Sequence, residues 1–395
     1  MQKPSKAEHW IADALDARRS EHLFREARTC AQVGGIYERD GQVIYNFCSN
    51  DYLDLARSST GKQAISEWTD TYGQGATASR LVCGNLPYHD ETETRLANFK
   101  AYPSALLFGS GYLANIGVIT ALVEKGDAVF ADRLSHACIL DGMRLSGARL
   151  GRFHHNNVDH LDRQLKRSTD ARRKLVITES LFSMDGDLAP LEDLAEVCER
   201  HEAMLLVDEA HATGVLGPQG RGLISKLGLQ DKVTISMGTM SKALGSYGGF
   251  VCCSPLMRDY LVNHARPFIY STALPPTVLA PVISALDFLE SNTEAPSLLM
   301  AKSNALRERL EHAGINTGES ESPIIPLMTG DEAIALAIDA RLQEQHILCA
   351  AIRPPTVPAG TSRLRLTLTL AHDDHAIDYV AERVITAFRE AGCIA

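Results

Sequence analysis

The chain has 395 residues, of which 45% are hydrophobic and 22% are charged, and its formal net charge is −10. This composition is that of a globular protein with a large core, and the length suggests roughly two to three domains. The acidic balance disfavours binding to nucleic acid or anionic membranes. The nine cysteines contain no CxxC pair, so neither zinc nor a disulfide framework is indicated, and a reducing, cytoplasmic location is expected.

The first thirty residues lack the apolar segment of a signal peptide and contain several acids, which also disfavours a transit peptide. Their pattern instead predicts an amphipathic helix over residues 5–30. Its apolar members are Trp10, Ile11, Leu15, Leu23 and Phe24, and its basic members include Arg18, Arg19, Arg25 and Arg28. A solvated helix face is the simplest interpretation of each arginine taken alone.

From residue 43 to about residue 285, short apolar strands alternate with amphipathic helices. Strands are predicted at 104–108, 128–137 and 174–179, and helices at 91–102 and 191–203. This alternation favours a mostly parallel sheet with helical crossovers. The ligand site of such a sheet lies at the carboxyl ends of its strands.

A glycine-rich turn follows the strand at 104–108 and reads GSGYLAN. Free backbone N–H groups at the start of the next helix would form an anion site around Gly109, Ser110, Gly111 and Tyr112. A plain tight turn explains this pattern equally well. The glycines at 109, 111 and 117 do not match the G-x-G-x-x-G spacing of a dinucleotide fold.

Three histidines, at 154, 155 and 160, lie close together in the sequence. Their spacing fits no zinc motif, so loop or surface histidines are predicted and no metal is expected.

The segment 204–245 carries the strongest chemical signal. Its first strand, MLLV, ends in Asp208 and His211, and its second, VTISMG, is followed by Thr239, Ser241 and Lys242. A lysine can hold pyridoxal phosphate as a Schiff base, and a carboxylate opposite the pyridine nitrogen keeps that nitrogen protonated. The alternative is that Asp208 caps a helix and Lys242 is a surface lysine.

The letters DEAH at 208–211 also form a helicase box. A helicase needs a G-x-x-x-x-G-K-[ST] phosphate loop, which the sequence lacks, so a nucleic-acid motor is disfavoured.

From about residue 285 the sequence changes to long helices and a few strands. In RLRLTLT, alternation puts Arg363 and Arg365 on the face opposite Leu364 and Leu366. An arginine facing a cleft would clamp a carboxylate, and an arginine facing solvent is the alternative.

Together these motifs resemble the α-oxoamine synthases, fold type I pyridoxal-phosphate enzymes. The residues that carry the resemblance are SNDYLDL, GSGYLAN, ADRLSHA, TESLFSMDGDLAPL, DEAHATGVLGPQGRG, TMSKALG, IYSTALPP and AIRPPTVPAGTSRLRLTLT. The resemblance implies an α/β fold with a large domain around a mostly parallel seven-stranded sheet and a smaller α+β C-terminal domain. The implied divisions are an N-terminal helical arm (1–45), the cofactor domain (46–285) and the small domain (286–395).

The resemblance also implies the site. Lys242 would carry the cofactor, Asp208 would pair with the pyridine nitrogen, and His136 would stack on the ring. Further cofactor contacts would come from Gly111, Tyr112, Ser183, His211, Thr239, Ser271 and Thr272, the last two from the same or the partner subunit of a homodimer. Substrate contacts would come from Arg25, Asn50, Thr356 and Arg365, with Ser79 close by.

The implied reaction condenses L-alanine with a pimeloyl thioester, carried by coenzyme A or by a carrier protein, and releases CO2. The alternative is a sister enzyme that takes glycine and a shorter acyl-CoA. The chain departs mildly from common family forms, with Tyr112 where Phe is frequent, DEAHATG where DDAHGTG occurs and TMSK where TFGK occurs.

Overall fold

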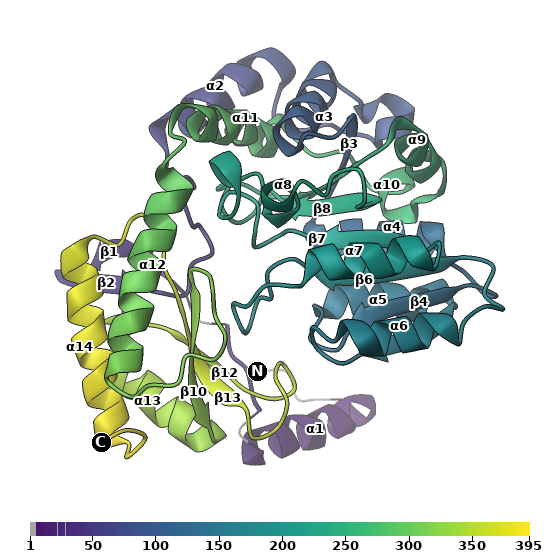
Figure 1. Cartoon of the computed structure of the whole chain (residues 1–395). Coiled ribbons are helices and arrows are strands. Elements are labelled where there is room, and N and C mark those ends of the chain that lie inside the picture. The colour runs from purple at the N-terminus through teal and green to yellow at the C-terminus, as the bar shows by residue number, and fades with distance from the viewer. Residues whose placement is uncertain (1–4, 22, 28) are drawn as a thin grey trace.

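A computed structural model describes residues 5–21, 23–27 and 29–395. A seven-stranded sheet forms the centre of a large body, and two three-stranded sheets with long helices form a smaller body beside it (Figure 1). His22 and Arg28, which belong to the predicted N-terminal helix, lie outside the described residues. The divisions predicted after residues 45 and 285 stay predictions.

The large sheet confirms the predicted mostly parallel architecture. Its strands run in the order β3-β9-β8-β7-β6-β4-β5, and β9 is antiparallel to both of its neighbours while the other pairs are parallel. The interior strands read as continuous apolar runs because helices cover both of their faces. The strands are β3 (Ser104–Phe108), β4 (Ala128–Asp132), β5 (Arg149–Phe153), β6 (Lys174–Glu179), β7 (Met204–Asp208), β8 (Ile235–Thr239) and β9 (Gly249–Cys253).

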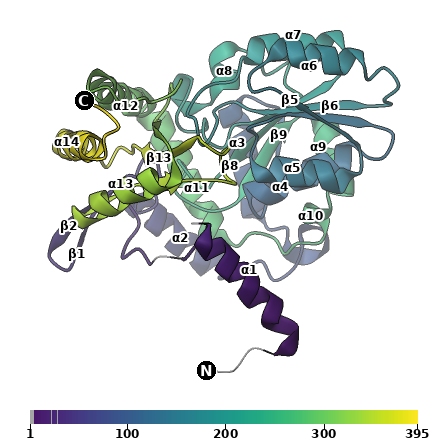
Figure 2. The same ribbon diagram turned by 90° about the horizontal axis from the view of Figure 1, so that it is seen from below.

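Helices form a layer on each face of this sheet (Figure 2). The layer on one face packs against Leu106, Val129 and Ile177, and the layer on the other packs against Phe130 and Val176. The first layer consists of α4 (Gly111–Leu122), α5 (Ala137–Ser146), α9 (Pro255–His264) and the short α10 (Arg266–Ile269). The second layer consists of α6 (Val158–Lys166), α7 (Leu191–Arg200) and α8 (Leu223–Leu227).

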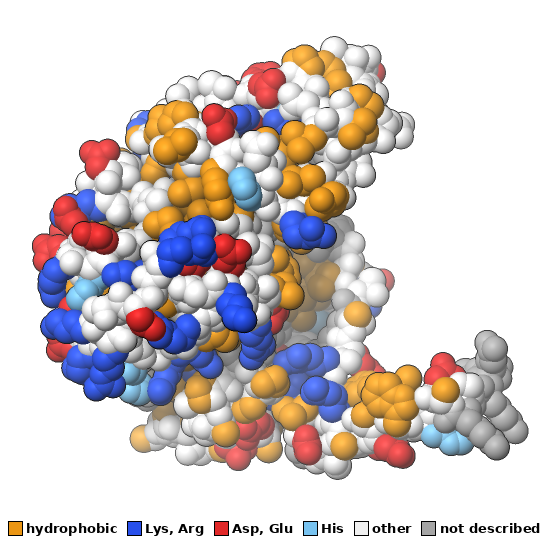
Figure 3. All heavy atoms as spheres, turned by 90° about the vertical axis from the view of Figure 1, so that its right-hand side faces the viewer, with side chains coloured by type: hydrophobic (Ala, Val, Ile, Leu, Met, Phe, Trp, Pro, Cys, Tyr) orange, Lys and Arg blue, Asp and Glu red, His pale blue; other side chains and the backbone are white. Residues whose placement is uncertain are grey.

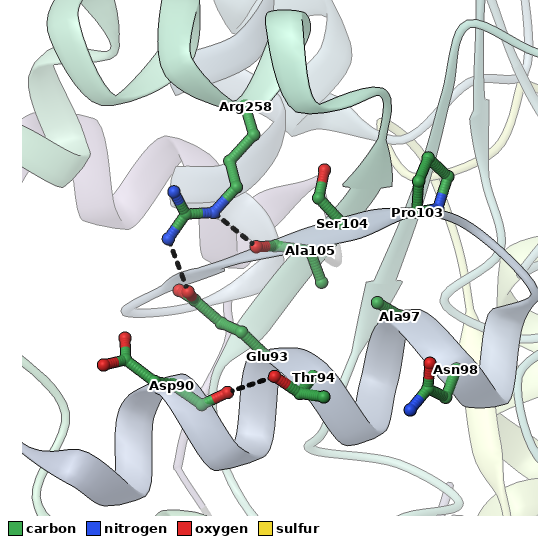
Figure 4. Close-up of a pocket in the computed structure, with 9 residues that line it drawn as sticks. All are labelled: Asp90, Glu93, Thr94, Ala97, Asn98, Pro103, Ser104, Ala105 and Arg258. Carbon is green, nitrogen blue, oxygen red and sulfur yellow. Dashed lines mark hydrogen bonds and ion pairs between the residues drawn. The ribbon is translucent and has the colours of Figure 1, made fainter.

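Three further helices pack together at the β3 edge: α2 (Ser59–Tyr72), α3 (Pro87–Lys100) and α11 (Pro276–Ser291). A cavity of about 310 Å³ lies here between α3, β3 and α9 (Figure 4). Two of its charged side chains pair with each other, since Arg258 Nη2 donates to Glu93 Oε2 at 3.0 Å, and Arg258 Nε also donates to the Ala105 carbonyl at 3.2 Å. These contacts tie α9 to α3 and β3.

The smaller body contains an antiparallel sheet in the order β10-β13-β12. All six residues of β13 are buried, so neither Arg363 nor Arg365 faces solvent, and the alternative prediction for these arginines is wrong. The elements of this body are α12 (Ala295–His312), β10 (Ile324–Gly330), α13 (Glu332–Glu344), β11 (Ile347–Leu348), β12 (Ala350–Ile352), β13 (Ser362–Thr367) and α14 (Asp374–Glu390).

A hairpin before residue 47 also joins this smaller body. It consists of β1 (Ile36–Arg39) and β2 (Gln42–Asn46), and β2 pairs in parallel with β11. The N-terminal segment and the C-terminal body therefore share a three-stranded sheet.

The N-terminal helix is shorter than predicted. A 3-10 turn (Lys6–Glu8) leads into α1 (His9–Ser20), and no helix includes the described residues between Glu21 and Gly35. None of the α1 residues is buried, and Trp10 is 66% exposed. Within the described residues none of the apolar side chains of α1 is buried against another element, so packing does not stabilise a longer helix, whereas Leu23 and Phe24 of the predicted stripe are half-buried beyond the end of α1. Figure 2 shows α1 projecting away from the large body.

No helix in the described part of the chain is both long and apolar enough to cross a membrane.

Candidate active site

One cavity lies where the large sheet presents the carboxyl ends of β6, β7 and β8. Its volume is about 220 Å³, and we call it the strand-end cavity. The end of each of these strands contributes a polar side chain, as expected for an open α/β sheet. The cavity is lined by Ser110, Gly111, Tyr112, Asn115, His136, Cys138, Glu179, Asp208, Ala210, His211, Met237, Thr239, Ser241 and Lys242.

Lys242 and Asp208 both line this cavity, as predicted. Burial lowers the pKa of Lys242 to about 8, although the nearby carboxylates of Asp208 and Glu179 favour its charged form. The Asp208 carboxylate is fixed by two donors: the Ala210 N–H at 2.9 Å and Asn115 Nδ2 at 2.8 Å. An amine with a lowered pKa therefore shares the cavity with an anchored anion.

His136 caps the start of α5. Its backbone N–H donates to Glu179 Oε1 at 2.6 Å, and its Nδ1 accepts from the Cys138 N–H. Burial lowers the pKa of His136, and the Asp208 charge only partly opposes this effect. His136 is thus a neutral imidazole held at the cavity wall.

His211 follows Asp208 and is also buried. Its Nδ1 lies 2.7 Å from the Tyr52 hydroxyl. Burial lowers the pKa of His211 well below its ordinary value, and burial raises the pKa of Tyr52 to about 12. Both groups are therefore neutral near pH 7 and can exchange hydrogen bonds without a charge.

The start of α4 has the geometry expected of the anion site that the sequence predicts. Ser110 is the N-cap and its side chain accepts from the Leu113 N–H. Gly111 and Tyr112 occupy the first helical turn, whose N–H groups have no acceptor within the helix. Opposite this turn, Thr239 Oγ1 lies 2.6 Å from Ser241 Oγ and 2.8 Å from the Gly248 carbonyl. An anion would meet backbone N–H groups and two hydroxyls here.

Seven predicted site residues do not line the strand-end cavity, and they form three groups. Arg25 Nη2 donates to Thr356 Oγ1 at 3.2 Å, and both belong to a second cavity of about 220 Å³, here called the arm pocket. Its lining consists of Leu23, Arg25, Ala351, Ile352, Arg353, Pro354 and Thr356.

The second group is the pair of the buried Arg365 and the half-buried Asn50. Arg365 Nη2 donates to Asn50 Oδ1 at 3.1 Å, while Arg365 Nε is buried with no hydrogen-bond partner among the described residues. A free buried guanidinium donor is suited to an incoming carboxylate.

The third group consists of hydroxyl residues outside the cavity wall. Ser183 is buried in the loop after β6, and Ser271 and Thr272 line a small separate cavity with Arg80 and Phe268. Ser79, also named from the resemblance, forms an antiparallel bridge with Thr272.

His155 lies in a loop, as predicted, and it is paired there. Its Nδ1 lies 3.0 Å from Asp132 Oδ1 and its Nε2 lies 2.7 Å from Asp187 Oδ2. These hydrogen bonds and charges raise the pKa of His155 to about 10 against the effect of burial. The described residues contain no cluster of three potential metal ligands.

Sequence reasoning missed four residues of the site. Glu179 ends β6 in register with Asp208 at the end of β7, so the strand pattern could have identified it. Asn115 and Cys138 contact the site from inside two helices, and Tyr52 reaches His211 across 159 residues of sequence. A single sequence carries no signal for such long-range contacts.

The chain is similar to known proteins over nearly its whole length. The family described as aminotransferase class I and II matches residues 42–384. An 8-amino-7-oxononanoate synthase of Anaeromyxobacter dehalogenans is 47% identical over 370 residues, 93% of each chain.

Two solved structures extend this likeness to the fold. A high-resolution structure of a serine palmitoyltransferase (SPT) with the internal aldimine of pyridoxal phosphate (PLP) is 31% identical to this chain. The match covers 100% of both chains and has a TM-score of 0.92. The 8-amino-7-oxononanoate synthase of Francisella tularensis is 30% identical with a TM-score of 0.76, over 88% of this chain and 98% of that one.

Proposed function

This chain belongs to the 8-amino-7-oxononanoate synthases of the class I and II aminotransferase family, and we propose that the strand-end cavity is its active site. The enzyme is an acyltransferase of biotin synthesis, and its cofactor is pyridoxal 5′-phosphate. The observation that carries the proposal is the convergence of Lys242 and Asp208 on one cavity at the carboxyl ends of the strands. A cytoplasmic location stays a prediction.

The side chains around the cavity fit this cofactor. Lys242 would hold pyridoxal 5′-phosphate as a Schiff base, and the bound cofactor would supply an electron-withdrawing ring that stabilises negative charge on the amino-acid Cα. Asp208 would accept from the pyridine N–H, and its two donors keep its carboxylate in place. The first turn of α4 and the Thr239 hydroxyl would hold the phosphate.

Proton transfer falls to Lys242. Its Nζ accepts the Cα proton of the amino acid, and a pKa of about 8 suits an amine that takes up and returns a proton near neutral pH. His136 restricts the position of the substrate from the ring face. His211, a neutral group that is hydrogen-bonded to Tyr52, would face the phenolic oxygen of the cofactor. Ser183, in the loop after β6, would also form a hydrogen bond to the cofactor.

Two arginines are assigned to the substrates, which are L-alanine and a pimeloyl thioester. Arg365 would hold the alanine carboxylate with its free Nε, beside Asn50. Arg25 and Thr356 would contact the acyl substrate in the arm pocket. The alanine Cα, having lost its proton, would bond to the thioester carbonyl carbon as the C–S bond breaks and the thiol leaves. The Cα–carboxylate bond would then break to release CO2, and Lys242 Nζ would return a proton to Cα. Coenzyme A and a carrier protein both remain candidate acyl carriers.

We also propose a homodimer with shared sites. Ser271 and Thr272 do not line the strand-end cavity of their own chain, yet they adjoin exposed apolar side chains, of which Val82 and Tyr270 are 79% and 70% exposed. Figure 3 shows that the right-hand face of the molecule is hollowed between the main body and the projecting N-terminal helix. Such a face could receive a second copy, whose Ser271 and Thr272 would reach the phosphate of this chain.

Mixing two inactive variants tests the shared site. If Thr272 acts on the partner's site, a mixed dimer of Lys242→Ala and Thr272→Ala chains contains one intact site, and turnover returns after the two are dissociated and reassociated. If Thr272 acts within its own chain, no intact site forms. Absence of recovery in mixed dimers would refute sharing.

A sister activity has one observation in its favour, because the SPT structure superimposes with the higher TM-score, 0.92 against 0.76. Sequence identity favours the assigned activity, at 47% against 31%. The choice between amino acids depends on the space for one methyl group, worth about 1–3 kcal/mol.

Replacing Lys242 tests the active-site proposal. Lys242→Ala should lose detectable turnover of L-alanine and a pimeloyl thioester, because no other amine lines the strand-end cavity in the described residues. The exposed Lys226, on α8, provides the control, and Lys226→Ala should turn over normally. Normal turnover in Lys242→Ala would refute the proposal that the strand-end cavity is the active site.

A further inference from the structure

Two buried side chains that line the strand-end cavity, Cys138 and Asn115, contact each other. In the function proposed above Asn115 only anchors Asp208, and Cys138 has no role. Cys138 lies in the first turn of α5, two residues after His136, and is 3% exposed. Asn115 lies in α4, which packs against α5, and is fully buried. Both line the cavity together with His136, which is assigned to the ring face, and Asp208, which is assigned to the pyridine nitrogen.

Asn115 joins Asp208 to Cys138. Its Nδ2 donates to Asp208 Oδ2 at 2.8 Å and to Cys138 Sγ at 3.2 Å. The orientation of the amide follows from the carboxylate, since an ionised carboxylate only accepts hydrogen bonds and would repel Oδ1. Oδ1 has no hydrogen-bond partner in the described part of the chain, so it does not determine this orientation.

Cys138 in turn contacts the imidazole. Its Sγ lies 2.9 Å from His136 Nδ1, and its backbone N–H donates to the same nitrogen at 3.3 Å. A nitrogen that receives an N–H is the unprotonated one of a neutral imidazole. The thiol therefore donates to Nδ1, and the ring proton is on Nε2. Burial supports neutral partners, because it raises the pKa of Cys138 to about 12 and lowers the pKa of His136.

We propose that Cys138 is a positioning residue, which with Asn115 forms a hydrogen-bonded bridge from Asp208 to His136 and fixes the Nε2–H tautomer and the orientation of the imidazole. The proposal rests on the function assigned above, which gives His136 the ring face and Asp208 the pyridine nitrogen. The bridge would hold both groups in a fixed relation before either contacts a ligand. Such preorganisation is what a buried, continuous chain of hydrogen bonds between neighbouring side chains provides.

The direct test compares serine, alanine and valine at position 138. Cys138→Ser keeps a donor to Nδ1 and an acceptor for Asn115, whereas Cys138→Ala and the larger Cys138→Val remove both. Histidine-selective 15N NMR of the cofactor-free protein, assigned with His136→Gln, reports the tautomer and pKa of His136. The titratable groups around His136, unchanged in all three variants, are Glu179, Asp208, Lys242, Asp141 and His211.

We expect Cys138→Ser to keep the Nε2–H tautomer and the low pKa of His136. Cys138→Ala and Cys138→Val keep the backbone N–H that donates to Nδ1 and lose only the thiol donor, so a fraction of the Nδ1–H tautomer should appear and the His136 pKa should rise, because each donor to Nδ1 favours the neutral ring. The loss of one hydrogen bond in the loaded enzyme should lower kcat about tenfold.

A buried thiol elsewhere supplies the matched control. Cys198 on α7 is 2% exposed and packs in the hydrophobic cluster on the opposite face of the sheet, so Cys198→Ala should leave His136 and kcat unchanged. Unchanged His136 signals in Cys138→Ala and Cys138→Val would overturn the proposal, even if turnover falls. Failure of every form, wild type included, to use L-alanine would instead refute the proposed function, since the NMR result does not depend on turnover.

Discussion

The strand-end cavity and the arm pocket, the two ends of the proposed active site, differ in how firmly their side chains are held. In the strand-end cavity Asp208 is 5% exposed and accepts two hydrogen bonds, and His211 is buried against Tyr52. In the arm pocket Arg25 and Thr356 are exposed and share one hydrogen bond. The comparison indicates that the fold preorganises the groups proposed for cofactor chemistry, whereas the groups proposed for acyl binding would be ordered by the substrate or by a second chain.

The largest expected effect comes from Asp208. Asp208→Asn removes the charge that keeps the pyridine nitrogen protonated, so kcat should fall about 10³-fold, a size found when a preorganised electrostatic partner is lost. Steady-state kinetics with L-alanine would measure this loss, and Asp231→Asn, which alters an acid in the loop before β8, provides the control. A loss below tenfold would show that the anchored carboxylate is not central to the chemistry.

The next largest effect is expected at a buried ion pair formed by the residue that follows Asp208 in the sequence. Glu209 and Lys100 form an ion pair at 2.5 Å, and both are buried. Lys100→Met leaves the Glu209 charge unpaired and should lower the free energy of unfolding by about 3–5 kcal/mol, measured by urea denaturation.

The exposed pair of Arg19 and Asp16 in α1 is the matched comparison. Arg19→Ala should change the unfolding free energy by less than about 1 kcal/mol. Equal losses of unfolding free energy in Lys100→Met and Arg19→Ala would contradict the view that the side chains near the strand-end cavity are held more firmly than those of the N-terminal helix.

A smaller effect is expected at the arm pocket. Arg25→Ala should raise KM for the pimeloyl thioester about tenfold through loss of one charged contact, while kcat and the bound-cofactor absorbance stay unchanged. Initial rates at varied thioester and saturating L-alanine would measure this. A fall in kcat with no change in KM would mean that Arg25 acts on the chemistry rather than on acyl binding.

The smallest effect is expected in the loop between β5 and α6, where His155 contacts Asp132 and Asp187. The pKa of His155 is about 10 in the folded protein and about 6.5 when unfolded, because Asp132 and Asp187 favour the charged ring. Its stabilisation is therefore complete below pH 6.5 and is lost as the pH rises to about 10. His155→Gln should cost about 1–2 kcal/mol at pH 6 and little at pH 10.

Urea denaturation of both proteins at pH 6, 8 and 10 measures this difference. A difference that does not change with pH would show that the charge of His155 does not stabilise the loop.

The sequence predicted the frame of the site better than its details. The strand ends at Asp208 and Thr239 and the helix start at Gly111 follow from apolar runs and glycine placement, and the structure confirms them. Local patterns could not reveal that Asn115 reaches Asp208 or that Tyr52 reaches His211, because these contacts depend on how distant elements pack. The end of α1 at Ser20 was missed because amphipathic periodicity does not reveal whether a helix finds a partner.

The central claim is that the strand-end cavity holds pyridoxal 5′-phosphate on Lys242 and receives L-alanine. The most direct test is the visible absorbance spectrum of the purified protein, recorded before and after addition of L-alanine and, separately, glycine. We predict a cofactor band that changes with L-alanine, responds far more weakly to glycine, and is missing in Lys242→Ala. A protein that stays colourless after addition of the cofactor would contradict the claim, and a band that responds to glycine alone would assign the chain to a sister activity.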